Sequence, residues 1–480
     1  MLHCIQETGY YPRISRPVSP WTTLIQTCSR WRSLGLRTTF LWSYIDLRWR
    51  ARTIDNFLLH CGNSPLQFLL NFRDRESIEM DTRKFSSYLS QHSLKISDLD
   101  IVWPIESSTD GLAKFIADHV VPLDLPVLQN CAVQHFSWHP MESNIPNKMS
   151  TSLKALKLFR IRHPISELMY ESLNELYIAE VALELSEFFN IFRHIPSLRI
   201  LELRQVLQAE TRANQDTESL PDFIHPHLQS LVLGAIPKND ADIVFSKIQF
   251  PSLRNICLTL EYDFGQDVPS SLELPNASSS FIRDPTSLKL QYHRPYSAPS
   301  FIISSRHSRR TAEICFSAIV GHLWWNSILS LVEMQWQTSD LTTLHVDIAS
   351  LCTARAWSTF LRRHSSSVTR LIWTQWREMR NLREVFTLIR SDDTLLPRLE
   401  SLDICAVLGA PREMMDWLRW KAERRKLRVL ILPNRFGWRV TRSELEALVD
   451  KVVIAEDPTF EKRAEELRFE INSVYRVVES

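Results

Sequence analysis

Residues 172–179, SLNELYIA, and residues 197–204, SLRILELR, carry one pattern of apolar residues. In each, a leucine is followed three and five residues later by another apolar side chain, as in Leu173-Leu176-Ile178 and Leu198-Leu201-Leu203. Apolar residues that alternate with polar ones predict a short strand with one buried face. We therefore expect a strand at each copy of this motif.

The motif recurs along most of the chain at intervals of 20 to 32 residues, interrupted by one gap of 88 residues. The gap has room for two degraded copies, for which Leu288-Lys289-Leu290 and Ile314-Cys315-Phe316 are candidates. The other clear copies begin at Leu153, Leu228, Leu399 and Leu427, and weaker ones at Ile96, Leu128, Leu253, Leu341 and Val368.

Helical periodicity fills several intervals between the copies, for example from Leu185 to Ile195 and from Trp357 to His364. A strand plus a helical or irregular return, repeated in this way, resembles the leucine-rich repeat family. The resemblance implies an α/β fold, a solenoid (horseshoe) of stacked units that cannot bury their apolar faces alone. The asparagine or cysteine that the regular family carries nine places into the motif is absent, so we expect an irregular solenoid. An ordinary α/β sheet is the alternative.

A tryptophan-rich stretch, Pro20 to Leu47, precedes the repeats. Leu24, Cys28, Trp31 and Leu34 have the spacing of one face of an amphipathic helix. The unit is too short to hold a core of its own, so it needs either the following domain or a partner to pack against. Large aromatic residues serve equally as core residues or as partner contacts.

The order of residues in this stretch resembles the second half of an F-box of the fungal type. The matching residues are Cys28, Trp31, Arg32, the pair Leu41-Trp42, and Ile45-Asp46-Leu47. The Leu-Pro-x-Glu helix that opens the family's motif has no counterpart in residues 1–20. The resemblance implies that Leu24, Cys28, Trp31, Leu34, Leu41 and Trp42 form an F-box core or bind a Skp-family adaptor.

The predicted organisation has four parts. They are an N-terminal tail (1–19), a partial F-box-like helical unit (20–62), an irregular solenoid (63–454) and a charged C-terminal cap or tail (455–480). Within the solenoid, Pro- and Ser-rich sequence near 265–310 predicts a surface loop. Thr441 and Glu444 have capping-box spacing, so we expect a helix from Thr441 with Leu445, Leu448, Val452 and Val453 on its apolar face.

Composition excludes several classes of function. The 56 basic and 55 acidic residues leave a net charge of +1, which gives no electrostatic footprint for nucleic acid or an anionic membrane. The nine glycines are too dispersed for a phosphate-cradling loop, and no cofactor or metal motif is present. No apolar run approaches the ~18 residues of a membrane span. Eight cysteines without a Cys-x-x-Cys pair, and no signal sequence, predict a cytosolic or nuclear protein.

No catalytic motif appears, so we expect a binding protein; a hydrolase on an irregular α/β fold is a remote alternative. If the motif leucines point inward, the alternating residues face outward on the sheet. The candidate substrate surface comprises Lys157, Phe159, Tyr177, Glu202, Arg204, His345 and Arg370. The F-box resemblance implies a substrate-recognition subunit of an SCF-type cullin-RING ubiquitin ligase, which binds a Skp-family adaptor and a protein substrate. The alternative is a leucine-rich repeat interaction scaffold that has lost adaptor binding.

Overall fold

The structure is a computed structural model in which the chain divides into two compact units, Met1–Leu258 (unit 1) and Thr259–Ser480 (unit 2). The sequence-based boundaries at 19/20, 62/63 and 454/455 stay predictions. The structure describes residues 26–72, 78–103, 109–136, 141–142, 152–162, 171–204 except 182, 222–261, 281, 285, 287–293, 298–305, 309–316, 328, 332, 341–347, 354–364, 366–373, 386–404 except 393, 412–433 and 441–455.

Unit 1 is an α/β structure with a parallel sheet. Its main strands are β1 (Tyr44–Asp46), β2 (Leu66–Asn71), β3 (Ile96–Trp103), β4 (Asn130–His135), β6 (Ala155–Phe159), β8 (Glu175–Ala179), β9 (Ile200–Arg204) and β11 (Ser230–Pro237), and β13 (Asn255–Glu261) follows. Two short parallel pairs join β5 (Met141–Glu142) to β7 (Ile161–Arg162) and β10 (Phe223–Ile224) to β12 (Ile248–Gln249).

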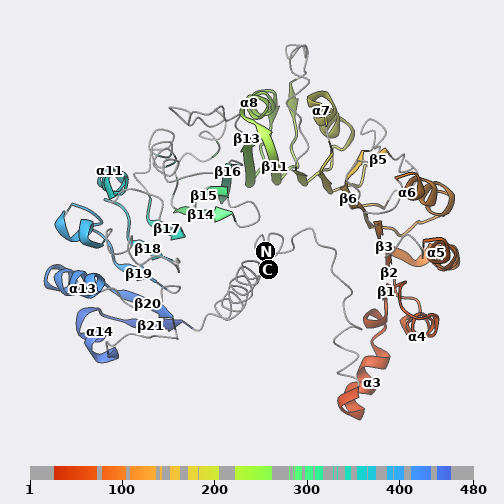
Figure 1. Cartoon of the computed structure of the whole chain (residues 1–480), viewed down its shortest axis with the longest axis horizontal. Coiled ribbons are helices and arrows are strands. Elements are labelled where there is room, and N and C mark those ends of the chain that lie inside the picture. Colours follow the sequence, from red (N-terminus) through yellow and green to blue (C-terminus); the bar gives the residue numbers. More distant parts are fainter. Residues whose placement is uncertain are drawn as a thin grey trace, which may run out of the picture. The chain divides into compact units, whose positions relative to one another are not determined.

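Helices and helical turns connect the strands of unit 1, and in Figure 1 α4, α5, α6 and α7 lie on one side of the sheet. They are α3 (Ser29–Arg37), η1 (Thr39–Trp42), α4 (Ala51–Cys61), α5 (Ile78–His92), η3 (Ser93–Lys95), α6 (Thr109–Phe115), the π-helical turn η4 (Ile116–Val120), α7 (Leu185–His194) and α8 (Lys238–Lys247).

The sheet of unit 1 follows the order of the chain. Each strand from β1 to β11 pairs in parallel with the next main strand, with no crossover. The motif leucines therefore form rows across the sheet; Leu156, Leu176 and Leu201 are register neighbours, each 1% exposed or less. The predicted strands are confirmed here, because each motif copy in unit 1 contains one.

Backbone and side-chain hydrogen bonds link successive motifs just before the strands. The Arg199 amide donates to the Asn174 carbonyl at 2.7 Å, and the Gln229 amide donates to the Arg199 carbonyl at 2.8 Å. Serine hydroxyls add a second set of links. They are Ser152 Oγ to Leu128 O at 3.3 Å, Ser172 Oγ to Leu153 O at 2.9 Å, Ser197 Oγ to Leu173 O at 2.9 Å and, in unit 2, Ser367 Oγ to Leu341 O at 2.9 Å.

Aromatic side chains hold the helices of unit 1 against its sheet. The ring of Phe72, after β2, lies 4.4 Å from that of Trp103, 4.9 Å from that of Phe85 and 5.0 Å from that of Phe115. These four side chains are each 2% exposed or less. Burying an aromatic side chain stabilises a fold by roughly 1.5–3 kcal/mol, so this cluster fixes α5 and α6 on β2 and β3.

Unit 2 is also α/β, with a sheet that is parallel over most of its width. Its strands are β14 (Ser287–His293), β15 (Ala298–Ser305), β16 (Arg310–Phe316), β17 (Thr343–Asp347), β18 (Arg370–Trp373), β19 (Ser401–Asp403), β20 (Val429–Pro433) and β21 (Val452–Ala455). Its helices are α11 (Ala354–His364), α13 (Arg412–Arg424) and α14 (Arg442–Leu448), which lie on one side of β17–β21 in Figure 1.

The prediction of a surface loop near 265–310 is wrong for the second half of that range. β14 pairs in parallel with β17, while β15 and β16 form antiparallel partners beside it. The strand candidate at Leu288-Lys289-Leu290 is therefore a repeat-like strand. The candidate at Ile314-Cys315-Phe316 is also a strand, β16, and it runs in the same direction as β14, but its described pairing is antiparallel, with β15. The segment packs into the core through apolar side chains such as Phe301 and Ile303, each 1% exposed or less, although it contains many serines. Residues 265–280 lie outside the described part.

The C-terminal end of unit 2 follows the prediction only at its start. Thr441 and Glu444 form the predicted capping box, and helix α14 begins at Arg442. The helix ends at Leu448, however, and Val452 and Val453 belong to β21, which pairs in parallel with β20. The last described element of unit 2 is thus a strand and not a helix. The predicted helices at 185–195 and 357–364 are confirmed as α7 and α11.

Candidate interaction surfaces

The N-terminal helical unit is attached to the sheet through Trp42. Its side chain is 5% exposed, its indole N–H donates to the Gly35 carbonyl at 2.8 Å, and its ring packs edge-on against Phe57 at 5.1 Å. Strand β1 follows directly and pairs with β2, so the predicted need of this unit for a neighbouring domain is met by the sheet. Trp42 is therefore a core residue.

Four large apolar side chains on α3 and η1 point to solvent. Trp31 is 51% exposed, Leu34 56%, Leu36 38% and Phe40 68%. We call these four residues the N-terminal apolar surface. Trp31 and Leu34 are three residues apart on α3 and so share a helix face. An exposed group of large apolar residues is typical of an interaction site.

The predicted helix face through Leu24, Cys28, Trp31 and Leu34 is not continuous. Cys28 has an extended backbone (φ −153°, ψ 163°) and is the N-cap of α3, where its Sγ accepts the Trp31 amide proton at 3.5 Å. It is exposed, and Leu41 is half-buried. Leu24 lies outside the described residues.

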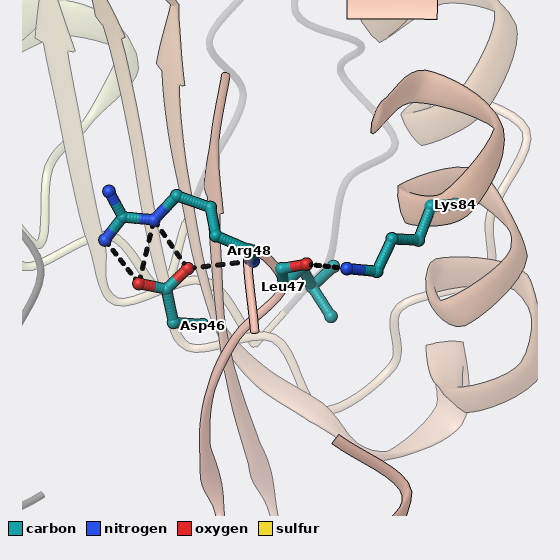
Figure 2. Close-up of polar contacts among 4 residues, drawn as sticks. All are labelled: Asp46, Leu47, Arg48 and Lys84. Atoms are coloured by element: carbon teal, nitrogen blue, oxygen red, sulfur yellow. Dashed lines mark hydrogen bonds and ion pairs between the residues drawn. The ribbon is translucent and has the colours of Figure 1, made fainter. Parts of the chain in front are cut away.

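A buried polar cluster holds the corner between β1 and α4 (Figure 2). Asp46, 2% exposed, accepts from Arg48 Nε at 2.9 Å and pairs with its guanidinium. Lys84, from α5, donates to the carbonyl oxygens of Leu47 at 2.6 Å and Trp49 at 2.7 Å. Burial lowers the pKa of Lys84, and the carboxylates of Asp81 and Asp46 oppose that shift. The cluster orients the N-terminal unit on the sheet.

The open face of unit 1 brings three predicted surface residues together. Lys157, Tyr177 and Glu202 are register neighbours on β6, β8 and β9. Lys157 is exposed and Tyr177 half-buried, while Glu202 is 9% exposed and pairs with the Arg204 guanidinium. Phe159 is only 5% exposed because it packs against Phe136 at 5.3 Å. Lys157 and Tyr177 thus offer more contact area than Phe159.

Arg160 and Glu180 lie beside this face, at the ends of β6 and β8, and form an ion pair. Both have left-handed backbones, with φ of 54° and 56°. Arg160 also donates to the Phe136 carbonyl at 3.1 Å. Sequence reasoning did not select this pair, because arginine and glutamate rarely adopt a left-handed backbone and so do not predict one.

Two further predicted residues lie on the open face of unit 2. His345 is half-buried on β17, and Arg370 is exposed on β18. Arg370 Nη2 lies 3.3 Å from Asp403 Oδ2 on the neighbouring strand β19. The structure thus places the seven predicted surface residues on two sheet faces, one in each unit.

Sequence reasoning missed two members of the N-terminal apolar surface, Leu36 and Phe40. The available signal was that both are large apolar residues close in sequence to Trp31. Within the described ranges, no group of three or more His, Cys, Asp or Glu side chains has the arrangement of a metal site. The same ranges contain no helix with the length and apolar character that crossing a membrane requires.

Comparisons with known proteins find similarity among solved structures, where 28 chains match. No protein-family model matches the chain, and no curated protein matches it. Among solved structures, the leucine-rich repeat-containing protein LegL7 from Legionella pneumophila aligns over 81% of this chain and 90% of its own, at 10% identity and a TM-score of 0.23.

Proposed function

We propose that the chain is a protein-interaction scaffold built as an irregular leucine-rich repeat solenoid. Parallel strands that follow chain order, one for each motif copy, support this architecture in each unit. Stacked units of this kind display an extended face on which proteins bind. Lys157, Tyr177 and Arg370 are the residues of that face that we expect to contact a protein substrate.

We infer that the N-terminal unit binds a Skp-family adaptor, so that the chain acts as an F-box-like substrate-recognition subunit of an SCF-type cullin-RING ligase. The observation that carries this inference is the exposure of Trp31, Leu34 and Phe40 beside a buried anchor, Trp42. Large apolar side chains held rigidly at a surface are typical of interface hot spots. Other subunits of the ligase would supply the ubiquitin-transfer chemistry.

A scaffold without adaptor binding is the second candidate. The observation that favours it is the break in the predicted helix face at Cys28, whose extended backbone separates it from α3. In this case the N-terminal apolar surface binds a different protein.

A pull-down of the full chain with a purified Skp-family adaptor distinguishes the two candidates. We expect the wild type to bind the adaptor. The double variant Trp31→Ala/Leu34→Ala should bind it with an affinity weaker by about tenfold or more, as is usual when interface hot spots are truncated. The control is Leu59→Ala on α4, a 75% exposed leucine outside the N-terminal apolar surface. Failure of the wild type to bind refutes the adaptor role and leaves the plain scaffold.

A further inference from the structure

A polar cavity opens at the N-terminal ends of β14 and β17 in unit 2. Its volume is about 380 Å³, which falls in the range of small-molecule and side-chain recognition sites. Six lining residues carry a hydroxyl and two carry a guanidinium, and none carries a carboxylate. The residues are Ser287, Ser304, Ser305, Arg309, Arg310, Thr311, Thr342 and Thr343.

Strand register gathers the hydroxyl groups. Thr311 on β16 is opposite Ser304 on β15, Ser304 is opposite Ser287 on β14, and Ser287 is opposite Thr343 on β17. Neighbouring strands lie about 4.8 Å apart, so the four residues form one row of hydroxyl-bearing side chains across four strands. Alternation keeps the row away from the core, because the following residues, such as Leu288 and Leu344, are buried.

Both arginines line the cavity where β16 begins, and Arg310 is opposite Ser305 on β15. Arg310 Nη1 donates to the Phe281 carbonyl at 3.1 Å, and its guanidinium carbon lies 5.0 Å from the centre of the Phe281 ring. These contacts hold the side chain and, among the described residues, engage one of its five N–H donors. Arg309 is exposed in the turn between β15 and β16. Neither guanidinium pairs with a carboxylate of the described residues, and Glu313 does not line the cavity.

This donor set matches a phosphoryl group better than a carboxylate. A phosphate monoester carries a charge of about −1.5 to −2 and three acceptor oxygens, which two guanidiniums and several hydroxyls can satisfy together. A carboxylate has one charge and two oxygens, and so would leave donors unsatisfied. Arginine is the side chain best suited to bidentate contact with phosphate.

We propose that this cavity binds the phosphoryl group of a phosphorylated segment of a partner protein. The inference rests on the proposed scaffold function, because a protein scaffold meets such groups on the side chains of its partners. Arg309 and Arg310 supply the balancing charge, and Ser287, Ser304, Thr311 and Thr343 supply hydroxyl donors. The arginine cluster is a common means of recognising phosphorylated segments.

The test uses the full chain and immobilised degenerate peptide libraries, each with one fixed phosphoserine, phosphothreonine or phosphotyrosine, beside unphosphorylated copies. We expect at least one phosphorylated library to bind and its unphosphorylated copy not to bind. Arg309→Gln/Arg310→Gln should weaken binding by about tenfold or more, since charge-assisted hydrogen bonds are lost. The matched control is Arg390→Gln/Arg398→Gln, two exposed arginines of unit 2 that do not line the cavity.

The single variant Arg309→Gln is less prone to misfold, because Arg309 is exposed and stacks on no ring of the described residues, whereas Arg310 stacks on Phe281. It should weaken binding several-fold without changing the melting temperature. Binding of inorganic phosphate without any peptide, equal binding of phosphorylated and unphosphorylated libraries, or no binding at all overturns the proposal. The adaptor pull-down probes the N-terminal apolar surface, so the two experiments fail independently.

Discussion

The Ser197 hydroxyl donates a hydrogen bond of 2.9 Å to the carbonyl oxygen of Leu173, which begins the preceding strand motif. The same hydroxyl lies 2.6 Å from the Glu171 carbonyl oxygen. Serines 152, 172 and 367 make the corresponding contact at their own motifs. A sequence without an asparagine ladder thus joins its motifs through serine hydroxyls.

Ser197→Ala should destabilise unit 1 by about 1–2 kcal/mol, because two carbonyl oxygens lose a shared donor. Chemical denaturation followed by circular dichroism measures this loss. Ser252→Ala is the matched control: Ser252 holds the same place before Leu253, but its hydroxyl makes no hydrogen bond to the described residues. Equal losses for the two variants would show that the hydroxyl links do not stabilise the fold.

Trp42→Phe should cost about 1–3 kcal/mol of stability, since it removes the indole hydrogen bond to Gly35 and leaves space beside Phe57. Trp31→Phe should change stability by no more than about 0.5 kcal/mol, as is usual for an exposed site. Thermal unfolding of both variants checks the contrast. A large loss for Trp31→Phe would mean that this tryptophan is structural.

Lys84→Met should destabilise the N-terminal unit by about 1–3 kcal/mol, because the carbonyl oxygens of Leu47 and Trp49 lose their ammonium donor. Lys451→Met, at an exposed lysine, is the control. Hydrogen exchange at residues 44–61 measures the local effect. Unchanged protection in Lys84→Met would contradict an anchoring role for this side chain.

We expect the free energy of unfolding to fall on acidification, and His135 to cause part of this fall. Burial lowers its pKa below the ordinary 6.5, and the positive charge of Arg160 lowers it further. The unfolded chain therefore binds a proton near pH 6.5 that the folded chain does not bind, and stability is lost as the pH falls from there towards the lowered pKa. In His135→Gln the loss between pH 7.5 and pH 5.5, measured by urea unfolding, should be smaller. An unchanged loss would assign the pH dependence to other groups.

The candidate sites were predictable only in part. Lys157, Tyr177 and Glu202 could be assigned to one sheet face because side chains alternate along a strand. How far each side chain is buried could not be predicted, since Glu202 is 9% exposed and pairs with Arg204 while its register neighbour Tyr177 is half-buried. Trp31 and Trp42 look alike in the sequence, and their opposite exposures depend on which one reaches Gly35 and Phe57.

The sequence by itself determined where the strands of each motif lie and that one face of each is apolar, because strand periodicity is a property of neighbouring residues. Only the tertiary structure decided what lies beside each strand. The pairing of Ser287 with both Ser304 and Thr343 turns a serine-rich segment into the wall of a cavity. Such pairings join residues far apart in the chain through backbone hydrogen bonds, which are not specific to residue type and so leave no local pattern in the sequence.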